Sequence, residues 1–443
     1  MQTKQGDGDD DSATQRRRER LVLVVLAAVQ FITVVDFMIV MPLGPQLMRA
    51  LEIRPAEFGL IVSSYTFAAG AAGILASSII DRFARRPTFM TLYAGFLLGT
   101  LLCALATSYH QLVFARVATG AFGGILGGMA MTIIGDVFPE GRRGRATSSL
   151  MTGFALASVA GVPFGLYLGT EHGWHIPFIA LVLLGAPVLG LMPIALPPLA
   201  GHIGKSHAHP LRAVLETFSH ATHLNAFALI VVLMVGNFTV FPYVSPYLVS
   251  NVGLTEQQLP LIYIAGGGLT LIAAPIIGRL ADRYGKLIIY RLIAPLSAVL
   301  LVVVTQLPRV SVAAAVAVFG ALMVCNVGRM IAAMAMVTSS VEPSRRGGFL
   351  SANSSVQHVA AGFGAYLGGA IITETADGRI EHFGTVGWIA GAATIFSLWL
   401  AGRVRPAKEH DISAESISLA AAAEAAVDAG EPMQNAAEET AEM

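Results

Sequence analysis

The sequence is poor in charge, in cysteine and in catalytic motifs. Only 13% of its 443 residues are charged, whereas about 25% is usual for a soluble domain. Its two cysteines, Cys103 and Cys325, lie in apolar runs of different halves, which favours two buried side chains over a structural disulfide. No phosphate-binding G-x-x-x-x-G-K-[ST] pattern, metal-ligand cluster or nucleophile motif occurs. The sequence therefore supports neither an ATP-driven pump nor an enzyme, and we expect no cofactor and no metal.

Apolar runs fill most of the chain instead. Hydrophobic residues make up 55% of the sequence, its mean hydropathy is +0.67, and about 20 apolar residues suffice for a helix to cross a bilayer. We identify twelve such runs, at residues 21–47, 58–80, 87–107, 111–137, 146–170, 174–198, 223–250, 257–280, 287–307, 311–338, 347–372 and 383–403. The first is too long for a signal-peptide core, and no small-residue cleavage site follows it. We therefore predict an all-α integral membrane protein with twelve transmembrane helices.

The basic residues lie mainly on one side of this topology. Twelve spans place both termini on the same side, and that side holds 22 of the 28 Lys and Arg residues. The loops of the other side hold four, and the remaining two, Arg116 and Arg329, fall inside spans. Short basic loops stay in the cytoplasm. We therefore predict a multi-pass protein of the inner or plasma membrane with both termini in the cytoplasm.

Polar segments divide the chain into two six-helix bundles. Residues 199–222 are polar and contain several histidines, which we interpret as solvated side chains of a cytoplasmic linker rather than metal ligands. The N-terminal bundle then covers residues 21–198 and the C-terminal bundle residues 223–403. Cytoplasmic tails of residues 1–20 and 404–443 flank them, and the second is rich in Ala and Glu, as in flexible or partly helical extensions.

The two halves repeat the same short patterns in the same order. The matching pairs are Asp81-Arg82 with Asp282-Arg283, "MAM" at 129–131 with 334–336, "PEGRRGR" at 139–145 with "PSRRGG" at 343–348, and "FGLYLG" at 164–169 with "FGAYLGG" at 363–369. All offsets lie between 199 and 205 residues. Two halves of the same topology are related by an axis along the membrane normal, an architecture typical of transporters with a site at the midplane between the halves.

These motifs resemble the major facilitator superfamily across nearly the whole membrane region. "GRLADRYGK", residues 278–286, resembles the loop signature between helices two and three, in its second-half position. The first-half copy, "SSIIDRFARR", departs from it at Ser77 and Ala84, where glycine is usual. "LVFARVATGAFGG", residues 112–124, resembles the arginine motif of helix four. "SVAGVPFG", residues 158–165, partly resembles the helix-five motif of antiporters.

The resemblance implies charged gates at the cytoplasmic side and a hinge in helix five. Such gates hold that side closed while the protein opens outward, and a carboxylate at a helix C-terminus needs a partner because the dipole disfavours it there. The resemblance assigns one gate to Asp81, Arg82, Arg85 and Arg86, the other to Asp282, Arg283 and Lys286, and the hinge to Gly161, Pro163 and Gly165. Val162 separates Gly161 from Pro163, a departure from the family spacing. The alternative is that the loop charges only fix the topology.

Asp36 is the only acidic residue deep inside a predicted span. A charge at the bilayer centre costs about 2.5–3.5 kcal/mol on insertion scales, so this carboxyl must be hydrated, protonated or paired. Arg116 lies at a similar depth, given a rise of about 1.5 Å per residue, and the resemblance places spans one and four face to face. We predict that Arg116 pairs with deprotonated Asp36 and releases it on protonation. The alternatives are a polar residue at a kink before Pro42 and an arginine that fixes helix packing.

Polar and aromatic residues of the second half predict a substrate cavity. Asn237 stands at the repeat-equivalent position of Asp36 but cannot ionise. The predicted lining comprises Asn237, Phe241, Tyr243, Arg329, Gln357 and His358. Packing is the alternative for the two aromatic residues. Histidine is the side chain that ordinarily titrates near neutral pH, so His358 is a candidate for a charge change, and a hydrogen-bonded structural role is its alternative.

The sequence thus predicts a secondary active transporter that works by alternating access. The resemblance points to proton-coupled exporters of drugs or small metabolites. The expected partners are a small-molecule substrate, protons and the lipid bilayer, without nucleic acid and as a monomer. One alternative is a proton-coupled importer of a sugar or organic acid, in which Arg116 and Arg329 clamp an anion. Another is a non-transporting receptor or sensor on a transporter scaffold, against which the two gate loops argue.

Overall fold

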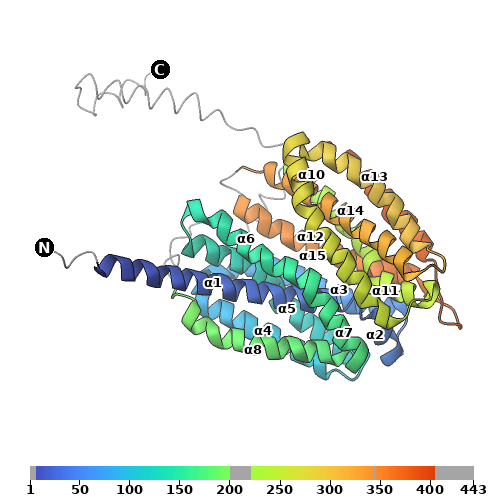
Figure 1. The fold of residues 1–443 in the computed structure, drawn as a ribbon, viewed down its shortest axis with the longest axis horizontal. Coiled ribbons are helices and arrows are strands. Elements are labelled where there is room, and N and C mark those ends of the chain that lie inside the picture. Colours follow the sequence, from blue (N-terminus) through green and yellow to red (C-terminus); the bar gives the residue numbers. More distant parts are fainter. Residues whose placement is uncertain (1–5, 200–220, 343–345, 405–443) are drawn as a thin grey trace, which may run out of the picture.

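The protein is nearly all helical. The computed structural model describes residues 6–199, 221–342 and 346–404 (Figure 1). The helices of the first half are α1 (Gly6–Ile39), α2 (Gly44–Ala50), α3 (Pro55–Ile79), α4 (Arg85–Leu105), α5 (Tyr109–Val137), α6 (Glu140–Leu156), α7 (Val162–His172) and α8 (His175–Ala195). Those of the second half are α10 (Ala221–Val240), α11 (Val244–Tyr247), α12 (Leu259–Tyr284), α13 (Lys286–Thr305), α14 (Val312–Ser339), α15 (Arg346–Ile371) and α16 (Phe383–Ala401).

The long helices confirm the predicted architecture of twelve transmembrane helices. In the described ranges, eleven stretches are long and apolar enough to cross a membrane, and α6 and α7 form one of them. The remaining long helix is α15, which occupies the eleventh predicted run and carries several polar side chains. Its polarity is tolerable because it packs along α3 of the other half and thereby removes part of its surface from lipid.

Two predicted spans end earlier than their apolar runs. The first run reaches residue 47, but α1 ends at Ile39 and the short helix α2 begins after Pro42. The seventh run reaches residue 250, but α10 ends at Val240 and continues as short 3₁₀, α and π turns around Pro242 and Pro246. Proline lacks the amide hydrogen that an inner helical turn needs, so hydropathy alone overestimates the length of both helices.

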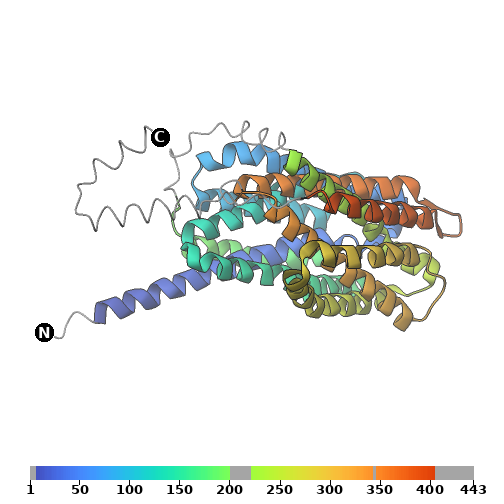
Figure 2. The ribbon, with the colours of Figure 1, turned by 90° about the horizontal axis from the view of Figure 1, so that it is seen from above.

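The ends of the predicted bundles also differ from the structure or lie outside it. Helix α1 begins at Gly6, so most of the predicted N-terminal tail is helical and extends beyond the bundle (Figures 1 and 2). Nearly all of the predicted linker and C-terminal tail lies outside the described residues. A two-stranded hairpin, β1 (Thr373–Glu374) with β2 (Ile380–Glu381), connects α15 and α16.

Small residues allow the two halves to pack closely. Helix α3 lies along α15, and α12 lies against α7 and the π turn that precedes it. A Cβ atom at Gly70 of α3 would lie 2.7 Å from Val359 Cγ2 of α15, and one at Gly267 of α12 would lie 3.1 Å from Ser158 O. These glycines therefore permit backbone approach that a larger residue would prevent.

The end of the bundle remote from the start of α1, here called the far end, holds several contacts between the halves. Helices α2 and α11 lie there (Figure 1), and a Cβ at Gly44 would lie 2.9 Å from Pro246 Cγ. The rings of Phe58 and Tyr243 meet edge to face, with centroids 6.0 Å apart. Arg49, in the last turn of α2, forms an ion pair with Glu256 of the second half. The far end is thus closed by apolar packing and one charged contact.

Candidate functional site

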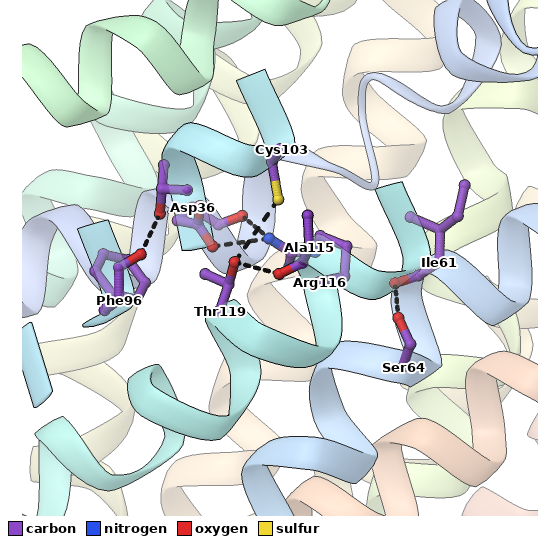
Figure 3. Close-up of polar contacts among 9 residues, drawn as sticks. Asp36, Ile61, Ser64, Phe96, Cys103, Ala115, Arg116 and Thr119 are labelled. Carbon is purple, nitrogen blue, oxygen red and sulfur yellow. Dashed lines mark hydrogen bonds and ion pairs between the residues drawn. The ribbon is translucent and has the colours of Figure 1, made fainter. Parts of the chain in front are cut away.

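An ion pair lies in the core of the first half. Arg116 Nη1 of α5 donates to Asp36 Oδ2 of α1 over 2.8 Å, and the two side chains are 1% and 0% exposed. The Thr100 hydroxyl of α4 lies 3.1 Å from both Asp36 Oδ1 and Phe96 O, and it can donate its single hydrogen to one of them at a time. Figure 3 shows Asp36 and Arg116 pointing toward one another. The predicted contact between them is therefore present, while its role in proton coupling stays a prediction.

The surroundings of this pair are buried and closely packed. The Tyr65 ring of α3 lies under the guanidinium, 4.4 Å from Arg116 Cζ. Cys103 Sγ and Thr119 Oγ1 lie 3.7 Å apart beside it (Figure 3). Arg116 Nε is buried without a partner among the described residues. Removing one member of such a buried pair costs about 3–5 kcal/mol, so a proton on Asp36 must force the site to rearrange or hydrate.

Glycine positions the first-half site. A Cβ atom at Gly120, one turn after Arg116, would collide with the backbone of Tyr65. Its absence allows α5 to approach α3 closely enough for the Tyr65 ring to cover the arginine. The arginine motif therefore combines the charged group with the packing that surrounds it.

A second buried arginine occupies the related place in the other half. Arg329 of α14 is 1% exposed. Its Nη2 donates to Asn237 Oδ1 of α10 over 2.8 Å and to Asn326 Oδ1 over 3.1 Å, and its Nη1 donates to Thr394 Oγ1 of α16 over 2.6 Å. Arg329 therefore binds the repeat-equivalent of Asp36, as Arg116 binds Asp36 itself. The sequence pointed to Asn237 and Arg329 but not to Asn326 or Thr394, which look like ordinary polar residues in apolar runs.

The other predicted cavity residues separate into two groups. Tyr243 is fully buried and its hydroxyl donates to Ala365 O, so in this conformation it packs between helices instead of lining a cavity. Phe241 is half-buried, with its ring 6.0 Å from that of Phe319. Gln357 donates weakly to Met334 Sδ at 3.9 Å, and His358 is half-buried.

The first charged loop makes a contact that the sequence did not reveal. Arg85 at the start of α4 is 7% exposed, and its Nε lies 3.3 Å from Asp136 Oδ2 near the end of α5. Arg82 is exposed and Arg86 half-buried, while the Asp81 side chain lies outside the described residues. Asp136 stands at the end of a predicted span beside a basic loop. This position is the feature of the sequence that could have indicated its ion pair with Arg85.

The second charged loop contacts its own half. Lys286 Nζ donates to Ala335 O of α14 over 3.4 Å, and the Arg283 guanidinium lies 5.3 Å from the Tyr284 ring. Asp282 is exposed and forms no ion pair with a described residue. In this conformation these three residues therefore do not connect the halves through any described side chain.

The predicted hinge lies next to Asp36. A π turn at Ala157–Gly161 separates α6 from α7, and Pro163 follows in the first turn of α7. A Cβ at Gly161 would collide with Val35, the residue before Asp36, and one at Gly165 would lie 3.1 Å from Ile39 Cδ1. π turns are local irregularities frequent at functional sites. The Gly-Pro motif thus joins an irregular helix segment to the segment that carries the carboxylate.

The residues described by the structure contain no group of three or more His, Cys, Asp or Glu side chains that could hold a metal ion. In the described part of the chain, the polar side chains inside the bundle include arginine, amide, hydroxyl, imidazole and thiol groups and the carboxyl of Asp36. Such groups can bind and release a proton and can hydrogen-bond a solute.

Two six-helix halves with buried polar side chains define a membrane transporter, and comparisons specify its family. The chain belongs to the Major Facilitator Superfamily, whose family model matches residues 26–331 and again 226–430. It is 26% identical over 391 residues to the uncharacterized MFS-type transporter YtbD of Bacillus subtilis (strain 168), an alignment that covers 88% of this chain and 96% of YtbD. The predicted family and fold are therefore confirmed.

Solved structures of other transporters share this fold. The structure of a D-xylose-proton symporter matches with a TM-score of 0.72 and 14% identity, covering 88% of this chain and 98% of that one. A bacterial homologue of the human lysosomal transporter Spinster, solved in an inward-facing and unoccupied conformation, matches with a TM-score of 0.65 and 16% identity, covering 87% and 96%. At these identities the likeness establishes the fold alone.

Proposed function

We propose that this transporter exports a drug-like compound or small metabolite in exchange for protons. The observation that carries the proposal is the buried Asp36–Arg116 pair, which holds the only carboxyl deep in a span. A proton on Asp36 removes one charge of the pair and leaves the other unbalanced. Substrate binding that favours the charged pair would therefore favour proton release, and the two ligands would exclude one another.

The helix contacts support transmission of this change. Asp36 lies on α1, whose neighbouring residue Val35 touches the Gly161 region of the hinge. The hinge segment also packs against α12 of the second half. A rearrangement of the ion pair would thus be passed through the hinge segment alone to a contact between the halves.

In the proposed orientation, the protein lies in the inner or plasma membrane. Its termini and its charged loops lie in the cytoplasm. The support is the excess of Lys and Arg on that side. The closed far end would then face outward. Fusion of a reporter that is active only in the cytoplasm to the C-terminus tests this orientation.

The exchange is tested by growth of an efflux-deficient bacterial host on a broad compound panel. Wild-type protein is compared with Asp36→Asn at matched membrane expression. Asp377→Asn serves as the control because it changes an exposed carboxylate in the loop between α15 and α16. We expect wild type and the control to protect against the same compounds, and Asp36→Asn to lose that protection.

The other outcomes separate the alternatives. Equal protection by wild type and Asp36→Asn would assign Asp36 a structural role and overturn the coupling. Sensitisation of the host by wild type would indicate an importer. No effect of any variant on the panel would contradict drug export and favour a narrow metabolite carrier or a sensor.

A further inference from the structure

The Arg329 cluster carries a positive charge that no described residue balances. Its three partners, Asn237, Asn326 and Thr394, are all neutral, and no carboxylate in the described part of the chain forms an ion pair with it. Arg329 is nevertheless 1% exposed, and its Nε has no partner there. A buried charge needs a counter-charge or full hydrogen bonding, and this arginine has neither.

The first half shows what the second half lacks. Arg116 meets the carboxylate of Asp36, whereas Arg329 meets the amide of Asn237 at the repeat-equivalent position. Each arginine therefore contacts the same repeat position of its own half, but the two clusters differ in net charge. When Asp36 is deprotonated, the first-half pair is neutral, and the excess charge lies with Arg329.

Arg329 also fixes the orientation of two amides. A guanidinium can only donate hydrogen bonds, so both Asn237 and Asn326 must direct their Oδ1 atoms toward it. Each Nδ2 group is then turned away from the arginine, and neither donates to a described residue. Both asparagines are half-buried rather than fully buried. The cluster thus presents two amide donors next to an arginine, with no acceptor charge among them.

A stripe of half-buried residues leads to this cluster along α14. Asn326, Met330, Met334 and Thr338 recur every four residues and so lie on one face of the helix. Met334 and Thr338 line an open surface depression of about 410 Å³ together with Lys286, Ala335 and Ser339. Lys286 begins α13, so this depression lies toward the end of the bundle that carries the charged loops. The stripe therefore extends from a depression at that end toward Asn326.

We propose that Arg329, Asn237 and Asn326 form a binding site for an oxyanion of the transported compound, with a carboxylate as the chemical class. The carboxylate would supply the missing counter-charge and accept from both amides. This inference rests on the proposed transport function and specifies its substrate. It assigns the substrate group to the second half and the proton to the first.

The site is tested by ligand-induced stabilisation of the purified full-length protein in detergent. The probes are benzoate and hexanoate, each compared with its neutral amide, benzamide or hexanamide. We expect each carboxylate to raise the melting temperature of wild type in a saturable way, and each amide to have little effect. Arg329→Gln is expected to weaken carboxylate binding at least about tenfold, because it removes a charge-assisted contact.

Two further variants keep the test decisive if Arg329→Gln fails to fold. Asn326→Ala leaves the arginine in place and removes one half-buried amide, so we expect it to fold and to weaken carboxylate binding about fivefold. Arg309→Gln changes an exposed arginine between α13 and α14 and is expected to bind like wild type.

Several results would overturn the proposed site. One is an equal rise in melting temperature with acid and with amide, and another is no response of wild type to either acid. A third is a folded Asn326→Ala that binds carboxylate as well as wild type does. The last is an Arg309→Gln that loses as much carboxylate affinity as Arg329→Gln does. The binding measurement needs no proton gradient. Carboxylate binding that depends on Arg329, together with flux indifferent to Asp36, would uphold this site and overturn the proposed exchange.

Discussion

The difference between a carboxyl and an amide at equivalent positions separates the two halves chemically. Asp36 can bind a proton, whereas Asn237 can only accept and donate hydrogen bonds. Each contacts a buried arginine. Because position 36 is an aspartate, Arg116 belongs to a neutral pair that a proton on Asp36 would disrupt. Because position 237 is an asparagine, Arg329 keeps an unbalanced positive charge.

The Thr100 hydroxyl lies within hydrogen-bond distance of Asp36 Oδ1. We expect Thr100→Val, which removes this hydroxyl at nearly constant volume, to shift the carboxylate stretch of Asp36, because Oδ1 then loses a hydrogen-bond donor. The measurement is the infrared difference spectrum of the variant at one fixed pH. Asp36→Asn identifies the band by its disappearance.

Thr119→Val is the matched control for this measurement. Its hydroxyl donates to Ala115 O and lies near Cys103 rather than Asp36. We expect the Asp36 band of this variant to match that of wild type. An Asp36 band that stays unchanged in Thr100→Val would show that the hydroxyl does not contact the carboxylate.

At the scale of helices, prolines and glycines determine where each element ends and how closely it packs. Pro42 and Pro246 lie in the irregular segments that follow α1 and α10, and these segments meet at the far end. Glycines of α5 allow its approach to α3. Both effects are visible as residue types in the sequence, but the neighbour that each glycine contacts is not.

The contact of Gly120 with Tyr65 predicts a specific sensitivity of α5. Even the methyl group of Gly120→Ala would collide with the Tyr65 backbone, and forced overpacking typically costs about 1–3 kcal/mol. We expect a melting temperature several degrees lower than that of wild type. Tyr65 would also move from its place under Arg116.

Gly128→Ala on the same helix is the control, because a Cβ there meets nothing within 4 Å. Alanine is the better helix former, so this variant should be neutral or slightly stabilised. The measurement is thermal unfolding of both purified variants in one detergent. Equal melting temperatures for the two would refute close packing at Gly120.

At the scale of the whole molecule, the balance between conformations depends on contacts that connect the halves at the far end. The Arg49–Glu256 pair is one of them, with an arginine that is 67% exposed. An exposed ion pair contributes only about 0.2–1 kcal/mol. It can shift the population of a state a few-fold but cannot hold the far end closed alone.

Charge reversal tests this contribution. We expect Arg49→Glu and Glu256→Arg each to open the far end two- to fivefold more often, and the double variant to restore the wild-type value. The measurement is the rate of thiol labelling of Phe58→Cys in a background without Cys103 and Cys325. Phe58 is fully buried beside Tyr243, so its replacement reacts only when this end opens. A double variant as reactive as either single one would exclude direct pairing.

The sequence by itself determined the membrane spans, the internal repeat and the two intramembrane arginines. Hydropathy is a property of consecutive residues, so runs of sufficient length define the spans without reference to their neighbours. The resemblance, together with the rise per residue, also led to the contact of Asp36 with Arg116, because it placed their helices face to face at similar depth.

Only the tertiary structure decided the other contacts between polar groups. Asn326 and Thr394 complete the Arg329 cluster, Asp136 binds Arg85, and Tyr243 is buried by packing. These contacts depend on the rotation of each helix about its axis and on its depth relative to its neighbours. Hydropathy specifies neither quantity, since a helix apolar on nearly all faces can turn about its axis with little change in its contact with lipid.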